Sequence, residues 1–228
     1  MIGACIFDLD GTLCDSVVSI GTCVNHVLEE FGLPSVEIER FYYFVGDGVH
    51  QLILRTLAYV GAPENLAEAV MARYLKRFRE ECLYQVKPYE GIIAMLQAIH
   101  KRGIPMAVLS NKPHENTRKV IYTLFGKDTF AVVRGQQEGI PRKPDPRGAL
   151  MEAELLGILP EECLYVGDTA TDMRTGNRAG MVTVGVLWGF RDREELMANH
   201  AAHIIGHPRE LVNLLDGTFE ERIWKGTR

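Results

Sequence analysis

The second half of the chain alternates short apolar runs with amphipathic stretches, and this alternation constrains the fold more than any other feature. The apolar runs have the length of buried strands and lie at 105–110, 131–133, 163–167, 182–186 and 203–205. The amphipathic stretches have helical periodicity and lie at about 114–125, 146–156, 171–179, 192–199 and 208–215. This order predicts an α/β fold, with a Rossmann-like, mostly parallel sheet covered by helices on both faces.

The first half of the chain interrupts this alternation. Residues 2–7 predict one more buried strand, but the next strand does not begin until residue 105. In the interval, apolar residues recur at helical spacing over about 17–31, 49–60, 66–78 and 90–102. A crossover between parallel strands needs only a dozen or so residues. The extra helices therefore predict an insertion after the first strand.

We expect this insertion to be a small helical cap domain of residues 16–82. The Rossmann-like core would then consist of residues 1–15 and 83–228. The two connections, near 13–17 and 82–89, would act as a hinge. We expect the chain beyond Asp216 to be a loosely held tail.

Composition excludes several classes of partner. The formal net charge of −5 gives no basic surface, so we expect no nucleic acid partner. Apolar runs fall short of the roughly 20 residues that span a bilayer, so we expect no membrane partner. The five cysteines are odd in number and scattered. Together with the absence of a recognisable signal peptide, they predict reduced thiols and a cytoplasmic location.

Polar side chains gather where the predicted strands end. In an open parallel sheet, ligands bind beyond the carboxyl ends of the strands. The residues that follow strands, or lie in a loop reaching the same edge, are Asp8, Asp10, Ser110, Asn111, Lys112, Lys143, Asp168 and Asp172. Four carboxylates beside one crevice repel each other, so a positive charge must offset them. We expect Mg²⁺, which prefers oxygen ligands and leaves room for water and a phosphate.

These residue types suit the transfer of a phosphoryl group. Asp8 can attack phosphorus and form an aspartyl-phosphate, which splits one difficult displacement into two easier ones. Asp10 can protonate the leaving alcohol and then accept a proton from the water that cleaves the intermediate. Lys143 adds a fixed positive charge and Ser110 a hydrogen bond. Gly11 permits the sharp turn behind the two aspartates.

Four ordered segments resemble the signature motifs of the haloacid dehalogenase superfamily. They are "DLDGTL", "LSNK", "KPDP" and "GDTATD", and the helical insertion resembles the superfamily's small cap. The resemblance covers nearly the whole chain. It implies Asp8 as nucleophile, Asp10 as acid and base, and Ser110 and Lys143 on the phosphoryl group.

The resemblance also implies a metal site and substrate contacts. Mg²⁺ would bind Asp8, the carbonyl of Asp10 and Asp168, and Asp172 would orient a water or the lysine. Within the superfamily, "FVGDGVHQLI" and "GVLWGFRDREEL" resemble segments of the phosphoglycolate phosphatases. We therefore expect an Mg²⁺-dependent phosphatase acting on a small phosphorylated metabolite, as a monomer or homodimer. The residues expected at its substrate are Thr12, Asn111, Gly46 and Gly48.

Alternative interpretations stay open at this point. Pyrophosphatases, sugar phosphatases and phosphomutases share much of the pattern. A phospho-acceptor signalling module is more distant, because such modules are about half this length and lack the insertion. Arg55, Lys76 and Arg77 could meet a substrate carboxylate, but surface charges are the favoured interpretation. His200, His203 and His207 do not have the spacing of a zinc site.

Overall fold

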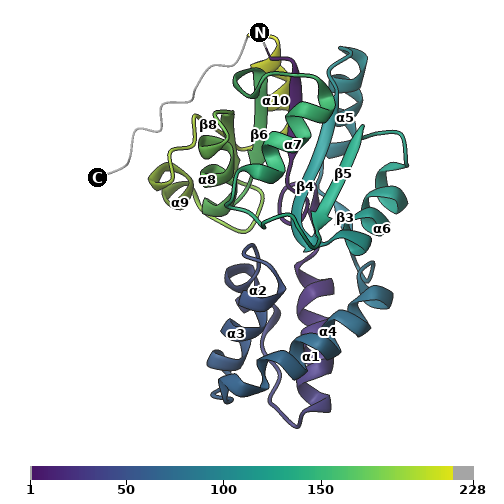
Figure 1. The fold of residues 1–228 in the computed structure, drawn as a ribbon, viewed down its shortest axis with the longest axis vertical. Helices are drawn as coiled ribbons and strands as arrows, with labels where there is room; N and C mark the ends of the chain where they lie inside the picture. Colours follow the sequence, from purple (N-terminus) through teal and green to yellow (C-terminus); the bar gives the residue numbers. More distant parts are fainter. Residues whose placement is uncertain (1, 218–228) are drawn as a thin grey trace.

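A parallel sheet of six strands runs through the upper lobe of the molecule in Figure 1. The computed structural model describes residues 2–217 of the 228-residue chain. The strands lie in the order β5-β4-β1-β6-β7-β8, and all neighbours pair in parallel. Their bounds are Ala4–Phe7 for β1, Met106–Pro113 for β4, Val132–Gln136 for β5, Cys163–Gly167 for β6, Val182–Val186 for β7 and His203–Ile205 for β8. The predicted α/β class is confirmed.

Helices cover both faces of this sheet, because side chains of each strand alternate between two apolar clusters. From β1, Cys5 and Phe7 join a cluster with α5, α6 and α10, whereas Ala4 and Ile6 join a second cluster with α7 and the turn after α8. The helices are α5 (Ile92–Lys101), α6 (His114–Phe125), α7 (Arg147–Leu156), α8 (Ala170–Arg178), α9 (Arg193–Ala198) and α10 (Pro208–Leu215), and a 3-10 turn spans Pro160–Glu162.

The remaining helices form a separate lobe beyond the carboxyl ends of the strands, at the bottom of Figure 1. Its elements are α1 (Val17–Glu30), α2 (Ile38–Phe44), α3 (Val49–Tyr59), a 3-10 turn (Glu64–Leu66) and α4 (Ala67–Glu81). We call this lobe the cap. Buried residues at helical spacing, such as Val24 on α1 and Val70 and Tyr74 on α4, hold the helices together.

The two connections between the lobes pair with each other. β2 (Cys14–Asp15) and β3 (Lys87–Pro88) form a short antiparallel ladder. The Tyr89 N–H also donates to the Leu13 carbonyl, at 3.2 Å. The chain therefore leaves the sheet and returns to it at one place.

Two elements differ from the sequence predictions. The helix α2 was not predicted, because it is two turns long and buries only Phe41, which leaves little periodicity to detect. β4 was predicted to end at residue 110 but continues to Pro113, with irregular pairing to β5 between Leu109 and Pro113. Ser110, Asn111 and Lys112 therefore belong to a strand instead of following one.

Some expectations concern the surface and the end of the chain. No helix among residues 2–217 is long and apolar enough to cross a bilayer. All five cysteines are free and buried. Of the predicted tail, Asp216 ends α10 and pairs with Arg102 at 2.6 Å, and residues 218–228 lie outside the described part of the chain.

Candidate active site

Two aspartates follow β1 at the face of the sheet that meets the cap. Asp8 is buried, and its Oδ1 lies 2.8 Å from the Nζ of Lys143. Asp10 points to a different partner, because its Oδ1 lies 2.8 Å from the Nζ of Lys112 and accepts from the Ser16 hydroxyl at 2.6 Å. The two carboxylates, which are two positions apart in the sequence, therefore have separate lysines and can take separate roles.

A glycine is required directly behind these aspartates. Gly11 has φ +89°, a conformation that side chains disfavour, and a Cβ on it would lie 2.2 Å from Oδ2 of Asp168. The backbone of Gly11 therefore lies against Asp168. This close approach brings the loops after β1 and β6 into one site.

Lys143 is held in place from both ends. Its Nζ contacts Asp8 and lies 2.7 Å from Oδ1 of Asp172, while its backbone N–H donates to Oδ1 of Asn111 at 2.9 Å. The Asn111 amide in turn donates to the Lys143 carbonyl at 3.1 Å. Burial lowers the pKa of Lys143, but Asp172 and Asp8 together raise it well above its usual value. Lys143 is thus a fixed cation.

Asp168 is fixed by hydrogen bonds from two loops. Its Oδ1 accepts from the Thr12 hydroxyl at 2.9 Å, and its Oδ2 accepts from the Phe190 N–H at 2.8 Å. We expected Thr12 to contact the substrate, but its hydroxyl is directed to Asp168 and it does not line the cavity described below. Thr12 therefore positions a carboxylate, and its contact with a substrate stays a prediction.

The loop that follows β7 was not assigned a role from the sequence. In addition to the Phe190 N–H, it supplies the Trp188 indole, which donates to the Thr12 carbonyl at 2.9 Å. A Cβ on Gly189 would lie 2.3 Å from the Cβ of Asp168 and 2.4 Å from the Gly11 carbonyl. Gly189 in "WGF" was the available signal, since glycine permits a close approach of the backbone to another group.

Asp172 orients the lysine and starts a helix. The N–H and the hydroxyl of Thr169 both donate to its Oδ2, at 3.1 and 2.7 Å, which completes a capping box on α8. Its other oxygen faces Lys143. One oxygen of Asp172 thus holds Thr169 and the other contacts Lys143.

The carboxylates form a group that fits a metal ion. Asp8, Asp168 and Asp172 each offer an oxygen, and these oxygens lie within 4.8 Å of each other. Burial raises the pKa of Asp8 to about 7, against the opposing effect of Lys143, and raises the pKa of Asp168 well above its usual range. A single buried lysine serves two of these three acids, so an oxygen-coordinated divalent cation such as Mg²⁺ suits the donor set.

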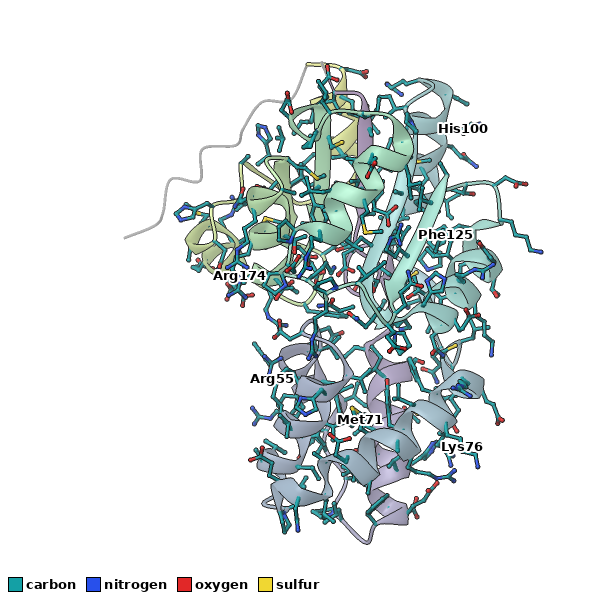
Figure 2. All side chains as sticks on the ribbon, viewed as in Figure 1. Arg55, Met71, Lys76, His100, Phe125 and Arg174 are labelled. Atoms are coloured by element: carbon teal, nitrogen blue, oxygen red, sulfur yellow. The ribbon has the colours of Figure 1, made fainter. Side chains whose placement is uncertain are left out.

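Other sequence candidates lie outside this group. The Asp10 carboxylate is engaged by Lys112, so only its carbonyl remains for a metal. Among residues 2–217 the three carboxylates form the only such cluster, and no histidine belongs to one. Lys76 is exposed on the outer side of the cap (Figure 2), Arg77 pairs with Glu30 and Glu81, and Arg55 pairs with Asp47.

A cavity lies between the cap and the core, over Asp8 and Asp10. Its core side includes Ser110, Asn111 and Lys112, and its cap side is mainly apolar, formed by Ile20, Val45, Val49, Leu52, Tyr74 and Phe78. Gly46 and Gly48 also line it, and the Gly46 carbonyl accepts from the Asn111 amide at 3.1 Å. The predicted cap glycines therefore lie at the site, and Asn111 joins the two lobes.

The site and fold define a class of enzyme. The chain matches the family model of the haloacid dehalogenase-like hydrolases over residues 5–186, and it belongs to that family. Its relatives identify it further as a phosphatase. It is 32% identical to a phosphoglycolate phosphatase of Aquifex aeolicus, over 95% of this chain and 98% of the relative, and 31% identical to an N-acetylmuramic acid 6-phosphate phosphatase of Pseudomonas aeruginosa, over 93% and 94%.

Solved structures show the same relationship. A protein from Lactobacillus delbrueckii subsp. bulgaricus, assigned as a phosphoglycolate phosphatase, superposes with a TM-score of 0.84 at 28% identity. The match covers 96% of this chain and 99% of that one. The likeness therefore extends over the core and the cap together.

Proposed function

We propose that this phosphatase hydrolyses a small phosphate monoester similar to 2-phosphoglycolate through an aspartyl-phosphate at Asp8, with Mg²⁺ bound at the aspartate cluster. The observation that carries the proposal is the separation of roles between Asp8, which contacts Lys143, and Asp10, which contacts Lys112, at the base of one cavity. One carboxylate can act as nucleophile while the other handles protons.

In the first step, a carboxylate oxygen of Asp8 forms a bond to phosphorus, and the bond between phosphorus and the ester oxygen breaks. Asp10 gives its proton to that oxygen, and the alcohol leaves. In the second step, a water oxygen bonds to phosphorus as Asp10 takes one of its protons. The bond between Asp8 and phosphorus breaks, which releases inorganic phosphate and restores both side chains.

Negative charge on the transferring group is offset by fixed groups. Lys143 and the Ser110 hydroxyl lie at the edge of the sheet where the phosphoryl oxygens would be held. Asp8, Asp168 and the Asp10 carbonyl would hold Mg²⁺, which would supply further charge stabilisation. Asp172 and Asn111 keep Lys143 in place, so the cation needs no reorganisation during the reaction.

The cavity favours a small organic leaving group. Its apolar cap side suits carbon atoms better than the second phosphate of pyrophosphate, which would bring further charge against buried side chains. The phosphoglycolate phosphatases among the relatives support a small hydroxy acid as the alcohol that leaves. The relative that is named for N-acetylmuramic acid 6-phosphate supports a larger one.

A panel of phosphate esters tests this proposal. The purified chain with Mg²⁺ is assayed on 2-phosphoglycolate, pyrophosphate, glucose 6-phosphate and N-acetylmuramic acid 6-phosphate, and kcat/KM is measured for each. We expect 2-phosphoglycolate to exceed the others by at least about tenfold, that is about 1.4 kcal/mol. A higher value for the muramic ester, or isomerised sugar phosphate in place of free phosphate, would overturn the substrate or the reaction type.

A further inference from the structure

The turn between α2 and α3 forms part of the wall of the cavity. It consists of Gly46, Asp47 and Gly48, and its two glycines have φ +124° and +86°. Both glycines line the cavity over Asp8, whereas the Asp47 side chain lines a second, polar pocket at the junction of the lobes. The Asp47 side chain therefore lies on the outer face of this wall.

Asp47 makes one contact in each lobe. Its Oδ1 accepts from the hydroxyl of Thr171 on α8 at 2.5 Å, and its Oδ2 accepts from the guanidinium of Arg55 on α3 at 2.5 Å. Burial raises the pKa of Asp47, but the hydrogen bonds from Thr171 and Arg55 outweigh this effect and lower the pKa below its usual value. Asp47 is therefore a carboxylate, and a hydrogen bond to a charged acceptor is stronger than one between neutral groups. Figure 2 shows Arg55 on the cap and Arg174 on α8 on the same side of the junction that Asp47 bridges.

The contact with Thr171 depends on a side chain of the cap. Asn111 and Arg191 also reach this part of the cap, but both donate to backbone carbonyls. The contact lies far along the chain from the two connections, which pair as β2 and β3. A hinge motion at these connections would separate Asp47 from Thr171 and move the turn of residues 46–48 away from the cavity.

The core end of this contact is the helical turn that also positions the catalytic lysine. Thr169 caps α8 and holds Asp172, whose other oxygen contacts Lys143. Thr171 belongs to the same turn, and its side chain is buried. A cap that is fastened to Thr171 is therefore fixed against the part of the core that holds Lys143.

We propose that Asp47 is a positioning residue that fastens the cap to Thr171, so that the turn of residues 46–48 closes the cavity only while this hydrogen bond is made. Arg55 holds the carboxylate of Asp47 toward the core. This inference goes beyond the proposed function, because it does not depend on which phosphate ester is hydrolysed.

A double-mutant cycle tests the contact. With Mg²⁺ and the ester of the panel that has the highest kcat/KM, KM and kcat are measured for the unchanged chain, Asp47→Ala, Thr171→Val and the double variant. Each single substitution should raise KM by about 5- to 10-fold and change kcat by less than about threefold, because the closed state that binds the substrate is less populated. The double variant should have no higher KM than either single variant. Thr171→Ser keeps the hydroxyl and should keep KM within about twofold.

Glu37→Ala is the matched control. Glu37 is also a cap carboxylate that accepts from a hydroxyl, but its partner Tyr59 belongs to the cap itself. Its removal should leave KM unchanged. If Asp47 only stabilised the cap from within, Thr171→Val would leave KM unchanged. If the two residues acted separately, their effects on KM would multiply in the double variant. Either result would overturn the inference.

A distance measurement tests the inference without turnover. Spin labels on Lys76→Cys of the cap and Leu155→Cys of α7 report the separation of the lobes by electron paramagnetic resonance. Both positions are exposed, and the five native cysteines are buried, so the labels react at the introduced thiols. With Mg²⁺ and inorganic phosphate present, we expect one narrow distance distribution, and a second population when Asp47→Ala is added. Thr171→Val should produce the same second population, which serves as the measurement if Asp47→Ala does not fold.

The outcomes separate this inference from the proposed function. Identical distance distributions with and without the Asp47 and Thr171 substitutions would overturn the role of Asp47, even in a chain that hydrolyses 2-phosphoglycolate. A second population in both variants of a chain that hydrolyses no ester of the panel would support the role of Asp47 and refute the proposed function alone.

Discussion

The core side and the cap side of the cavity differ in the kind of contact that holds their residues in place. On the core side, charged side chains hold each other, as Lys143 does with Asp8 and Asp172. On the cap side, apolar side chains face the cavity, and several hydrogen bonds from the core go to backbone carbonyls of the cap. Asn111 donates to the Gly46 carbonyl, and Arg191 donates to the carbonyls of Tyr42, Tyr43 and Val45. Backbone carbonyls persist when side chains change. The cap can therefore vary in sequence, and so in substrate, without losing its place.

The largest expected effect comes from the core side. Asp8→Asn removes the proposed nucleophile while keeping its size, and we expect kcat to fall by ~10⁴-fold or more. Turnover is measured on 2-phosphoglycolate, and circular dichroism and thermal unfolding check the fold. Residual turnover within a factor of ten of the unchanged chain would exclude a nucleophilic role for Asp8.

Removal of the metal should lower the rate almost as much as Asp8→Asn does. Excess chelator should lower the rate by ~10³-fold, because a divalent ion contributes several kcal/mol of charge stabilisation. Added Mg²⁺ should restore the rate. Asp168→Asn should raise the Mg²⁺ concentration needed for half-maximal activity, whereas Asp216→Asn, far from the cluster, should not. Full activity in chelator would contradict the metal assignment.

The tight contact between Gly11 and Asp168 predicts a smaller effect on both stability and rate. Gly11→Ala combines a strained φ with a clash, so we expect a loss of about 2–4 kcal/mol in unfolding free energy and at least ~10-fold in kcat. Gly61→Ala is the matched control, because Gly61 has φ +69° with nothing within 4 Å of the added Cβ. It should lose about 1 kcal/mol. Equal losses in the two variants would show that the approach of Gly11 to Asp168 is unimportant.

We expect the smallest effect on activity from a substitution that weakens the hold of the core on the cap. Arg191→Met removes hydrogen bonds to several cap carbonyls at about 1 kcal/mol each. We expect KM for 2-phosphoglycolate to rise by roughly 5- to 10-fold while kcat changes by less than about threefold, since the core side is unchanged. Arg209→Met on the exposed face of α10 serves as control. A fall in kcat with unchanged KM would contradict the division between the two sides.

Most of the core could be predicted because its signals are local. Each strand is a short apolar run, and the carboxyl ends of parallel strands meet, so Asp8, Asp168 and Lys143 could be expected together before any coordinates. The helix α2 could not, since its two turns depend on the packing of Phe41.

Residues that act through contacts between distant segments were also hidden. Asn111 reads as a polar residue at a strand end, but its role is to join the Lys143 backbone to Gly46 of the cap. Lys112 belongs to the segment "LSNK", but the sequence does not reveal its contacts with Asp10 and Phe78. Thr12 was expected at the substrate, but its hydroxyl donates to Asp168. The sequence does not reveal this contact between two distant loops.

The short ladder between β2 and β3 has a consequence for the history of such chains. Because Cys14 pairs with Pro88, the 70-odd residues between them begin and end at neighbouring points. A segment anchored in this way can be enlarged, shortened or exchanged for an unrelated one while every strand of the sheet keeps its neighbours. The same catalytic core can thereby acquire a new substrate specificity when only the inserted cap is replaced.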